Sequence, residues 1–146
     1  MDQAQFADQL LALESLFITK LMLWAGISLV AGTLVLALVR VKRIASVLLE
    51  RFATQALAWG VAELGFALWA RRGLELRDLA GAIQLDRIVW FSVGLETGVV
   101  LLGLALAVVG WRLGRRLGLV GTGVGIVVQG LALALLHLQL SAGILR

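Results

Sequence analysis

The chain contains no cysteine and no proline, and it has a single histidine. Without cysteine there is no disulfide, no thiol nucleophile and no Cys-ligated metal. Without proline, no helix is interrupted by a residue that lacks a backbone N–H. The lone histidine belongs to no His-Glu-x-x-His sequence and has no convincing serine partner, which disfavours a zinc protease or a serine hydrolase. We therefore expect that the protein is not an enzyme.

Charge is also scarce. Charged residues make up 15% of the 146 residues and hydrophobic residues 61%, and the mean hydropathy is +1.00. Soluble domains are about 45–50% apolar, even by a wider count that includes Gly. A water-soluble domain this small could not bury so much apolar surface, so we predict an integral membrane protein. The net charge of +4 comes from short basic clusters, which suit anionic lipid headgroups and predict no nucleic acid partner.

Four apolar stretches are each long enough to cross a bilayer, which takes about 20 residues of helix. The predicted fold is all-α, a transmembrane four-helix bundle with up-down-up-down topology in one domain, residues 1–146. The predicted spans cover about residues 16–39, 52–70, 88–111 and 117–140. Between the second and third spans, Leu76, Leu79, Ala80 and Ile83 follow helical spacing, which predicts a short interfacial helix there.

The distribution of Lys and Arg predicts the orientation of these spans. The links after the first and third spans carry most of the basic residues, and basic links favour the cytoplasmic side. We therefore expect both termini outside the cell. The excess over the other side is small, so insertion in both orientations remains open. The basic residues on the predicted inner side are Arg40, Lys42, Arg43, Arg51, Arg112, Arg115 and Arg116.

Polar residues inside the predicted spans are the candidate functional residues: Lys20, Glu63, Glu96, Gln129 and His137. Ionisable side chains are costly in lipid and usually face the interior of a bundle. At 1.5 Å per helical residue, Glu63 and Glu96 lie roughly 12–14 Å below the outer interface, and His137 reaches a similar depth. The spacing thus predicts one intramembrane polar cluster.

Small residues accompany these polar ones, as close helix packing in lipid requires. We assign the helix-packing role to Gly103, Gly110, Gly121, Gly125 and Gly130. There is also a faint internal repeat, in which Gln55 precedes Glu63 and Gln129 precedes His137 by eight residues each. It fits either a duplicated helical hairpin or coincidence in apolar sequence.

Several short motifs carry a family resemblance: Trp24-Ala25, Gly32, Gln55, Trp59-Gly60, Ala62-Glu63, Gly94-Leu95-Glu96, Gly103, Gly121, Gly125, Gln129-Gly130 and His137. With them the chain resembles an uncharacterised family of small four-helix bacterial integral membrane proteins, over most of its length after residue 15. The resemblance implies the fold and a place in the bacterial inner (plasma) membrane. The family pattern favours Asn in place of Glu63 and Asp in place of Glu96 and His137, and it implies no activity.

Three functions remain open. The polar cluster would suit transport of ions, protons or small solutes by an oligomer. A short chain with little mass outside the bilayer would suit an accessory or scaffolding subunit of a larger membrane complex. His137 would suit binding of haem, a pigment or a lipid, although the sequence identifies no particular cofactor. A carboxylate-rich metal site formed by Glu63, Glu96 and His137 is a further, less favoured hypothesis. The expected partners are the bilayer and either further copies of the chain or a larger complex.

Overall fold

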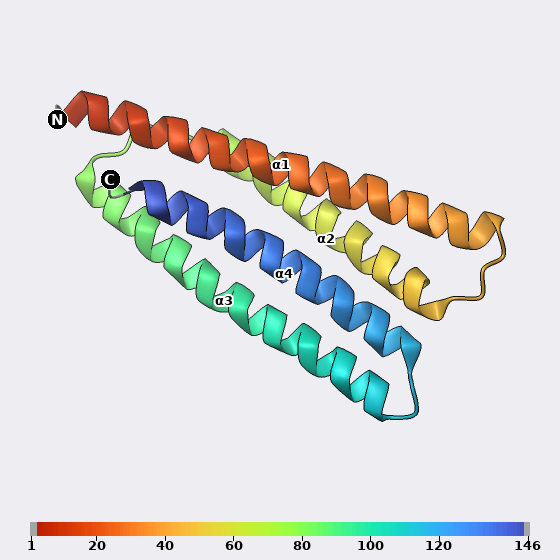
Figure 1. The fold of residues 1–146 in the computed structure, drawn as a ribbon. Helices are drawn as coiled ribbons and strands as arrows, with labels where there is room; N and C mark the ends of the chain where they lie inside the picture. The colour runs from red at the N-terminus through yellow and green to blue at the C-terminus, as the bar shows by residue number, and fades with distance from the viewer. Residues whose placement is uncertain (1–2, 145–146) are drawn as a thin grey trace.

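The computed structural model describes residues 3–144, which form four helices and contain no strand. The helices are α1 (Gln3–Val41), α2 (Val47–Arg72), α3 (Leu79–Arg112) and α4 (Leu117–Ile144). Consecutive helices run in opposite directions (Figure 1). The start of α1 and the end of α4 therefore lie at the same end of the molecule. The all-helical class predicted from the apolar stretches is confirmed.

Side-chain caps and tight turns determine where the helices begin and end. The hydroxyl of Ser46 accepts a hydrogen bond from the Leu49 N–H at 3.4 Å, and the carboxylate of Asp78 accepts one from the Gly81 N–H at 2.8 Å. The links after α1 and α3 each contain an arginine in the left-handed region, Arg43 with φ 49° and Arg115 with φ 55°. The link after α3 has a second residue in this region, Gly114 with φ 72°.

The short interfacial helix expected between the second and third spans is not a separate element. Leu76 lies in the link, whereas Leu79 and Ile83 belong to the first turns of α3. The helical spacing was correctly recognised, but no helix-breaking residue separates Ile83 from the apolar stretch that starts at Ile88. Backbone hydrogen bonding therefore continues unbroken from the Asp78 cap. For the same reason α1 begins at Gln3, well before the first predicted span.

Three of the helices, α1, α3 and α4, are long and apolar enough to cross a membrane. The more polar α2 lies outside those limits. All four helices nevertheless have apolar outer surfaces, on which Leu23, Val61, Leu101 and Leu135 are each more than half exposed. Apolar surface exposed on this scale marks contact with lipid or with a partner.

Glycines let the helices of each hairpin cross closely. In the α3–α4 hairpin, a Cβ atom on Gly103 or on Gly123 would collide with the carbonyl oxygen of the other residue. In the α1–α2 hairpin, a Cβ on Gly32 would lie 2.9 Å from the Leu57 side chain and 3.0 Å from the carbonyl oxygen of Ala53. Close backbone approach at small residues supplies the van der Waals contact that joins helices in lipid.

The two hairpins are built on one plan. In the first, Gly60 packs against the carbonyl oxygen of Ala25, and in the second, Gly130 packs against the carbonyl oxygen of Glu96. Both glycines lie near the middle of their helices, and each makes a second contact with an aliphatic side chain one turn further along the partner helix. Gly60 and Gly130 are therefore structurally equivalent, and the two hairpins share one packing arrangement.

The register of this shared arrangement differs from the one that the sequence suggested. The polar residues suggested that His137 is equivalent to Glu63. Counting from Gly60 and Gly130 instead places His137 at the position of Ala67, about one helical turn away. Close packing at the glycines determines which positions correspond, and the polar side chains do not follow that correspondence.

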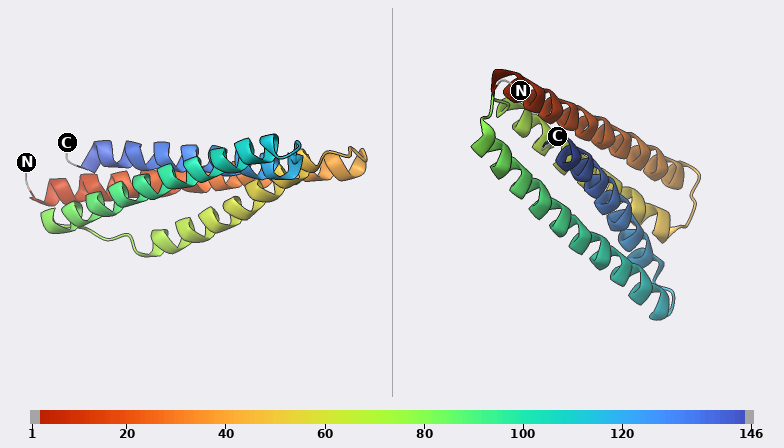
Figure 2. Two further views of the ribbon diagram at one scale, coloured as in Figure 1. Left: turned by 90° about the horizontal axis from the view of Figure 1, so that it is seen from below. Right: turned by 60° about the vertical axis from the view of Figure 1, so that its left-hand side comes forward.

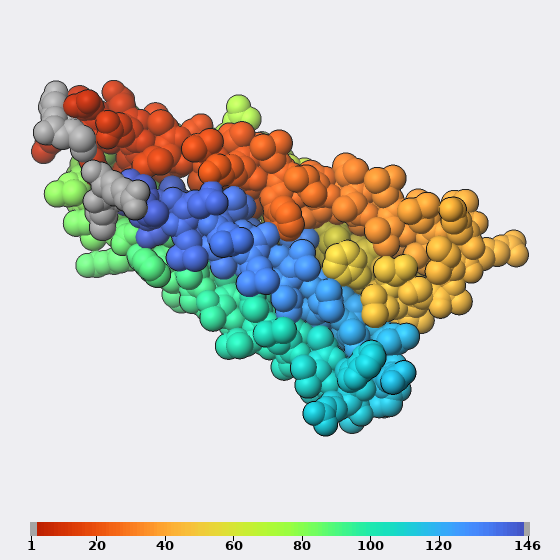
Figure 3. All heavy atoms as spheres, viewed as in Figure 1, coloured from red at the N-terminus to blue at the C-terminus, as the bar shows by residue number. Residues whose placement is uncertain are grey.

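The hairpins meet through α4, which packs against α1, α2 and α3. Gly121 approaches the backbone of Leu48, and Gly125 faces the side chain of Gln55. The space-filling view shows α4 lying between α1 and α3 (Figure 3). By contrast, α2 and α3 make almost no contact, and the C-terminal end of α2 diverges from the other helices (Figure 2). The bundle is therefore open on one side near that end.

Candidate ligand-binding site

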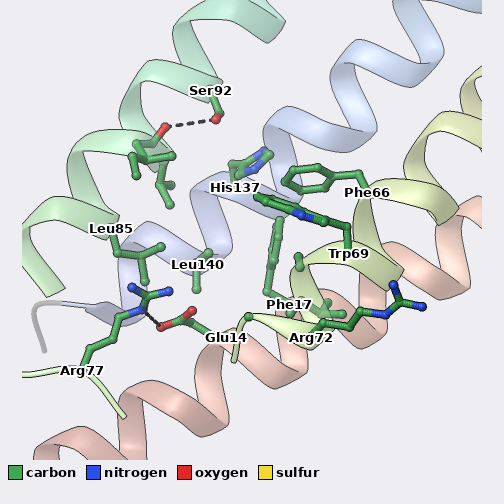
Figure 4. Close-up of a pocket in the computed structure, with 15 residues that line it drawn as sticks. Glu14, Phe17, Phe66, Trp69, Arg72, Arg77, Leu85, Ser92, His137 and Leu140 are labelled. Carbon is green, nitrogen blue, oxygen red and sulfur yellow. Dashed lines mark hydrogen bonds and ion pairs between the residues drawn. The ribbon is translucent and has the colours of Figure 1, made fainter. Parts of the chain in front are cut away.

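The gap between α2 and α3 holds a pocket of about 460 Å³. Phe66 and Trp69 of α2 form one wall, Leu85 of α3 stands opposite, and His137 and Leu140 of α4 lie behind (Figure 4). The size falls within the range of roughly 300–1,000 Å³ that is typical of small-molecule sites, and so does the combination of apolar walls with a few polar groups.

A contact between Glu96 and His137 provides the polar group in the wall of this pocket. The Nδ1 atom of His137 lies 2.6 Å from Oε1 of Glu96 and 3.2 Å from the carbonyl oxygen of Leu133. Helical side chains lean toward the N-terminus of their own helix, so residues on antiparallel α3 and α4 can lean toward each other. The side chain of Glu96 is 9% exposed and that of His137 is 14% exposed. The ring of Phe17 packs on the ring of His137, with centroids 4.9 Å apart.

Glu63 does not join this pair. Its side chain is buried on α2, and neither of its oxygens has a hydrogen-bond partner among residues 3–144. The second oxygen of Glu96, Oε2, is buried and unpartnered in the same part of the chain. Of the three ionisable residues predicted to share one layer, the structure brings Glu96 and His137 into contact and leaves Glu63 separate.

Gln129 and Lys20 connect α4 to α1 and do not line the pocket. The Oε1 atom of Gln129 accepts a hydrogen bond from the Trp24 indole at 2.7 Å, and its Nε2 donates to the Ser28 hydroxyl at 3.0 Å. The Lys20 ammonium donates to Oε1 of Gln139 at 2.8 Å. Both contacts are interhelical ties, as polar side chains commonly form in membranes.

The five glycines chosen for helix packing lie between helices. Gly103, Gly110 and Gly130 lie between α3 and α4, and Gly121 and Gly125 lie where α4 crosses α2. All five are buried. They bring the backbones together and contribute no polar side chain to the pocket.

The metal site considered for Glu63, Glu96 and His137 is not formed. In the part of the chain that the structure describes, no three acidic or histidine side chains lie close enough to hold a metal ion. The reason is that Glu63 projects from α2 into an apolar environment, whereas the other two residues meet between α3 and α4.

Sequence reasoning missed the ion pair at the mouth of the pocket. The Nε atom of Arg77 donates to Oε1 of Glu14 at 2.8 Å, and Glu14 is only 7% exposed. The sequence had placed both residues among the charges outside the bilayer. A signal was available, because Glu14 shares a helical face with Leu10, Ile18 and Leu21, all of which are buried. A charged residue on an apolar face indicates a partner on another element.

Comparison with known proteins places this architecture in a family. No curated protein and no solved structure matches the chain. Residues 20–138 match the model of a family of unknown function, DUF6992. The matched region contains both members of the Glu96–His137 pair, as well as Glu63 and Gln129, and it confirms the resemblance to an uncharacterised family. Since the match covers most of its length, the chain belongs to this family of unknown function.

Proposed function

We propose that the protein is a non-catalytic integral membrane protein that binds a membrane-soluble amphiphile between α2 and α3. In this proposal all four helices cross a bacterial inner membrane in up-down-up-down order, with both termini outside. The exposed apolar residues of α2 that do not line the pocket support its place in the bilayer, because Val61 is 64% and Leu68 49% exposed. Such residues on the outer face of a polar helix suit lipid as the surrounding solvent.

The pocket is the observation that carries the proposal. It lies where α2 diverges from α3 (Figure 2), and a ligand dissolved in the bilayer would enter between these two helices without crossing water. Its walls are mainly aromatic and aliphatic, which suits an apolar body. The Glu14–Arg77 pair at one end and His137 near the other supply polar contacts for a headgroup. Apolar walls with a few placed polar groups are the usual composition of a binding site.

Transport through a single copy has less support from the geometry. The hairpins are closed by the contacts of Gly32 and Gly103, and α2 and α4 meet at Gly121. At these crossings the helix backbones approach closely, which does not suit a water-filled path through one copy. The pocket and His137 lie toward the end of the bundle where α2 ends and α3 begins, so they suit the binding of a ligand from one leaflet.

A pocket-filling variant tests the proposal. Ser92 lines the pocket, and its hydroxyl donates only to the carbonyl of Ile88, one turn earlier on α3. In Ser92→Phe the new ring occupies the pocket without removing an interhelical contact. The protein is purified in mild detergent and washed, and bound small molecules are extracted for mass spectrometry and absorption spectroscopy. We expect one amphiphile in stoichiometric amount from the native protein and at least a tenfold loss from Ser92→Phe.

Thr97→Phe is the matched control. Thr97 also lies on α3, and its hydroxyl likewise donates one turn back, to the carbonyl of Val93, but it faces away from the pocket. This variant should retain the amphiphile. The proposal is wrong if the native protein carries nothing beyond the bulk lipid mixture, or if Ser92→Phe and Thr97→Phe retain equal amounts.

A further inference from the structure

We propose that the amphiphile is a phenol or hydroquinone with an apolar tail, whose ring hydroxyl donates a hydrogen bond to Nε2 of His137. This inference rests on the proposed binding function and adds the chemical class of the ligand. It follows from three features: the hydrogen-bonding state of the imidazole, the charges around the pocket and the aromatic residues that line it.

The partners of Nδ1 determine which nitrogen of His137 carries the hydrogen. The carbonyl oxygen of Leu133, 3.2 Å from Nδ1, is only an acceptor, so the tautomer that satisfies it carries the hydrogen on Nδ1, between this carbonyl and Oε1 of Glu96. In the neutral ring, Nε2 then has the free lone pair. Among residues 3–144 no group is hydrogen-bonded to Nε2, and His137 lines the pocket. The protein thus presents an acceptor to a ligand and holds it in place through the Glu96 carboxylate.

The Nε2 acceptor of His137 requires a hydrogen-bond donor on the ligand, and the charges around the pocket limit which headgroup can carry that donor. Arg72 and Arg77 both line the pocket, and Glu14 is paired with Arg77. This arrangement disfavours an ammonium headgroup, because the positive charge of Arg72 has no compensating carboxylate in the lining. A carboxylate or a phosphodiester would suit the arginines but has no hydrogen of its own to donate to Nε2. An uncharged headgroup with a hydroxyl brings no positive charge next to Arg72 and has a hydrogen to donate to Nε2.

The aromatic lining favours a hydroxyl that is attached to a ring. The rings of Phe66 and Trp69 have centroids 5.7 Å apart at an interplanar angle of 40°, and both project into the pocket from α2. The ring of Phe17, on α1, packs against the ring of His137 at an interplanar angle of 44°. Tilted aromatic neighbours of this kind pack well against another flat ring. An apolar tail would then leave sideways between α2 and α3, where the bundle is open.

The test measures the binding of three probes to the purified protein by isothermal titration calorimetry in detergent. The probes are 2-decylhydroquinone, its dimethyl ether and decanoic acid. The ether keeps the ring and the tail but lacks the donor, and the acid replaces the ring with an anion. We expect the hydroquinone to bind about 10-fold more tightly than the ether, as expected for one buried hydrogen bond of roughly 1.4 kcal/mol, and more tightly than the acid.

Glu96→Leu/His137→Phe removes the acceptor and its carboxylate together, so no buried charge is left unpaired. In this variant we expect the hydroquinone and the ether to bind equally. Gln139→Leu, which removes a polar side chain of α4 outside the pocket, should leave the preference unchanged. Equal affinity of the two ring probes for the native protein, or tighter binding of decanoic acid, would overturn the inference and leave the binding function intact. If no probe binds and no amphiphile copurifies, the proposed function itself fails.

Discussion

The two hairpins share the glycine contacts at which their helices cross, and they differ in the side chains that lie between their two helices. At the positions that correspond to Glu96 and His137, the first hairpin has Ala25 and Ala67, each fully buried. The glycine contacts are therefore sufficient to build a hairpin, and the Glu96–His137 hydrogen bond is an addition to the second one. A feature that one of two similarly packed hairpins lacks is not needed for their architecture. This comparison is the reason for assigning the Glu96–His137 pair to binding rather than to folding.

The crossings should give the largest effect on stability. A side chain on Gly123 would meet the Gly103 carbonyl and the backbone of Ala107, neither of which can move far. We expect Gly123→Leu to lose about 3 kcal/mol of unfolding free energy or the folded form altogether. Gly32→Leu in the first hairpin should lose less, about 1–2 kcal/mol, because its nearest obstacle is the flexible side chain of Leu57. Denaturation in mixed micelles, followed by circular dichroism, measures both.

Gly98→Leu is the control for these substitutions, because nothing lies within 4 Å of a Cβ at that position of α3. Its stability should stay close to that of the native protein. If Gly123→Leu were as stable as Gly98→Leu, the second hairpin would not depend on its glycine crossing, and the comparison between the hairpins would lose its basis.

The hydrogen-bonded Glu96–His137 pair offers the next largest effect. Glu96→Ala alone leaves the Nδ1 hydrogen of His137 without its closest acceptor, which should cost about 2 kcal/mol. Glu96→Ala/His137→Ala reproduces the alanines of the first hairpin and should lose less stability than the sum of the two single changes, its remaining loss coming from the cavity that truncation leaves. The same unfolding measurement yields the coupling energy of the pair. Strictly additive losses would show that the two side chains do not interact.

The sequence predicted the four helices because long apolar stretches identify membrane helices without any knowledge of their neighbours. The links at Arg43 and Arg115 are short, so the pairing of consecutive helices was also within reach. Depth along a helix predicted that Glu63, Glu96 and His137 lie at similar levels. The direction in which each side chain points depends on how the helices are rotated, and one sequence does not determine that rotation.

The pocket could not be predicted for a related reason. It lies where the C-terminal end of α2 diverges from α3, while the N-terminal end of α2 packs against α4 at Gly121. A glycine in an apolar sequence indicates close packing but not the helix against which it packs. The repeat register was wrong on the same ground, since polar residues were used to align the hairpins while the glycines determine their geometry.

Glu63 allows a test in which the first hairpin, and not the second, has the polar residue. Counting from the equivalent glycines places Leu133 at the same position of the second hairpin. Because both Glu63 oxygens are buried without a partner among residues 3–144, we expect Glu63→Leu to raise the unfolding free energy by about 1–2 kcal/mol. Glu50→Leu, at an exposed position of the same helix, should change it little. A loss of stability in Glu63→Leu would instead mean that Glu63 has a partner outside this chain.

The smallest effect is expected at Gln129, which is equivalent to Trp59 and ties the second hairpin to α1. Gln129→Leu removes hydrogen bonds to Trp24 and Ser28 and leaves the indole N–H partly buried, so we expect a loss of about 1 kcal/mol. Gln139→Leu removes the exposed contact to Lys20 and should cost close to nothing. Because Gln129 lies outside the pocket, its variant should retain the native content of bound amphiphile. A Gln129→Leu protein that kept its stability but lost the ligand would place the binding site between α1 and α4 and would contradict the division between structural and binding polar groups.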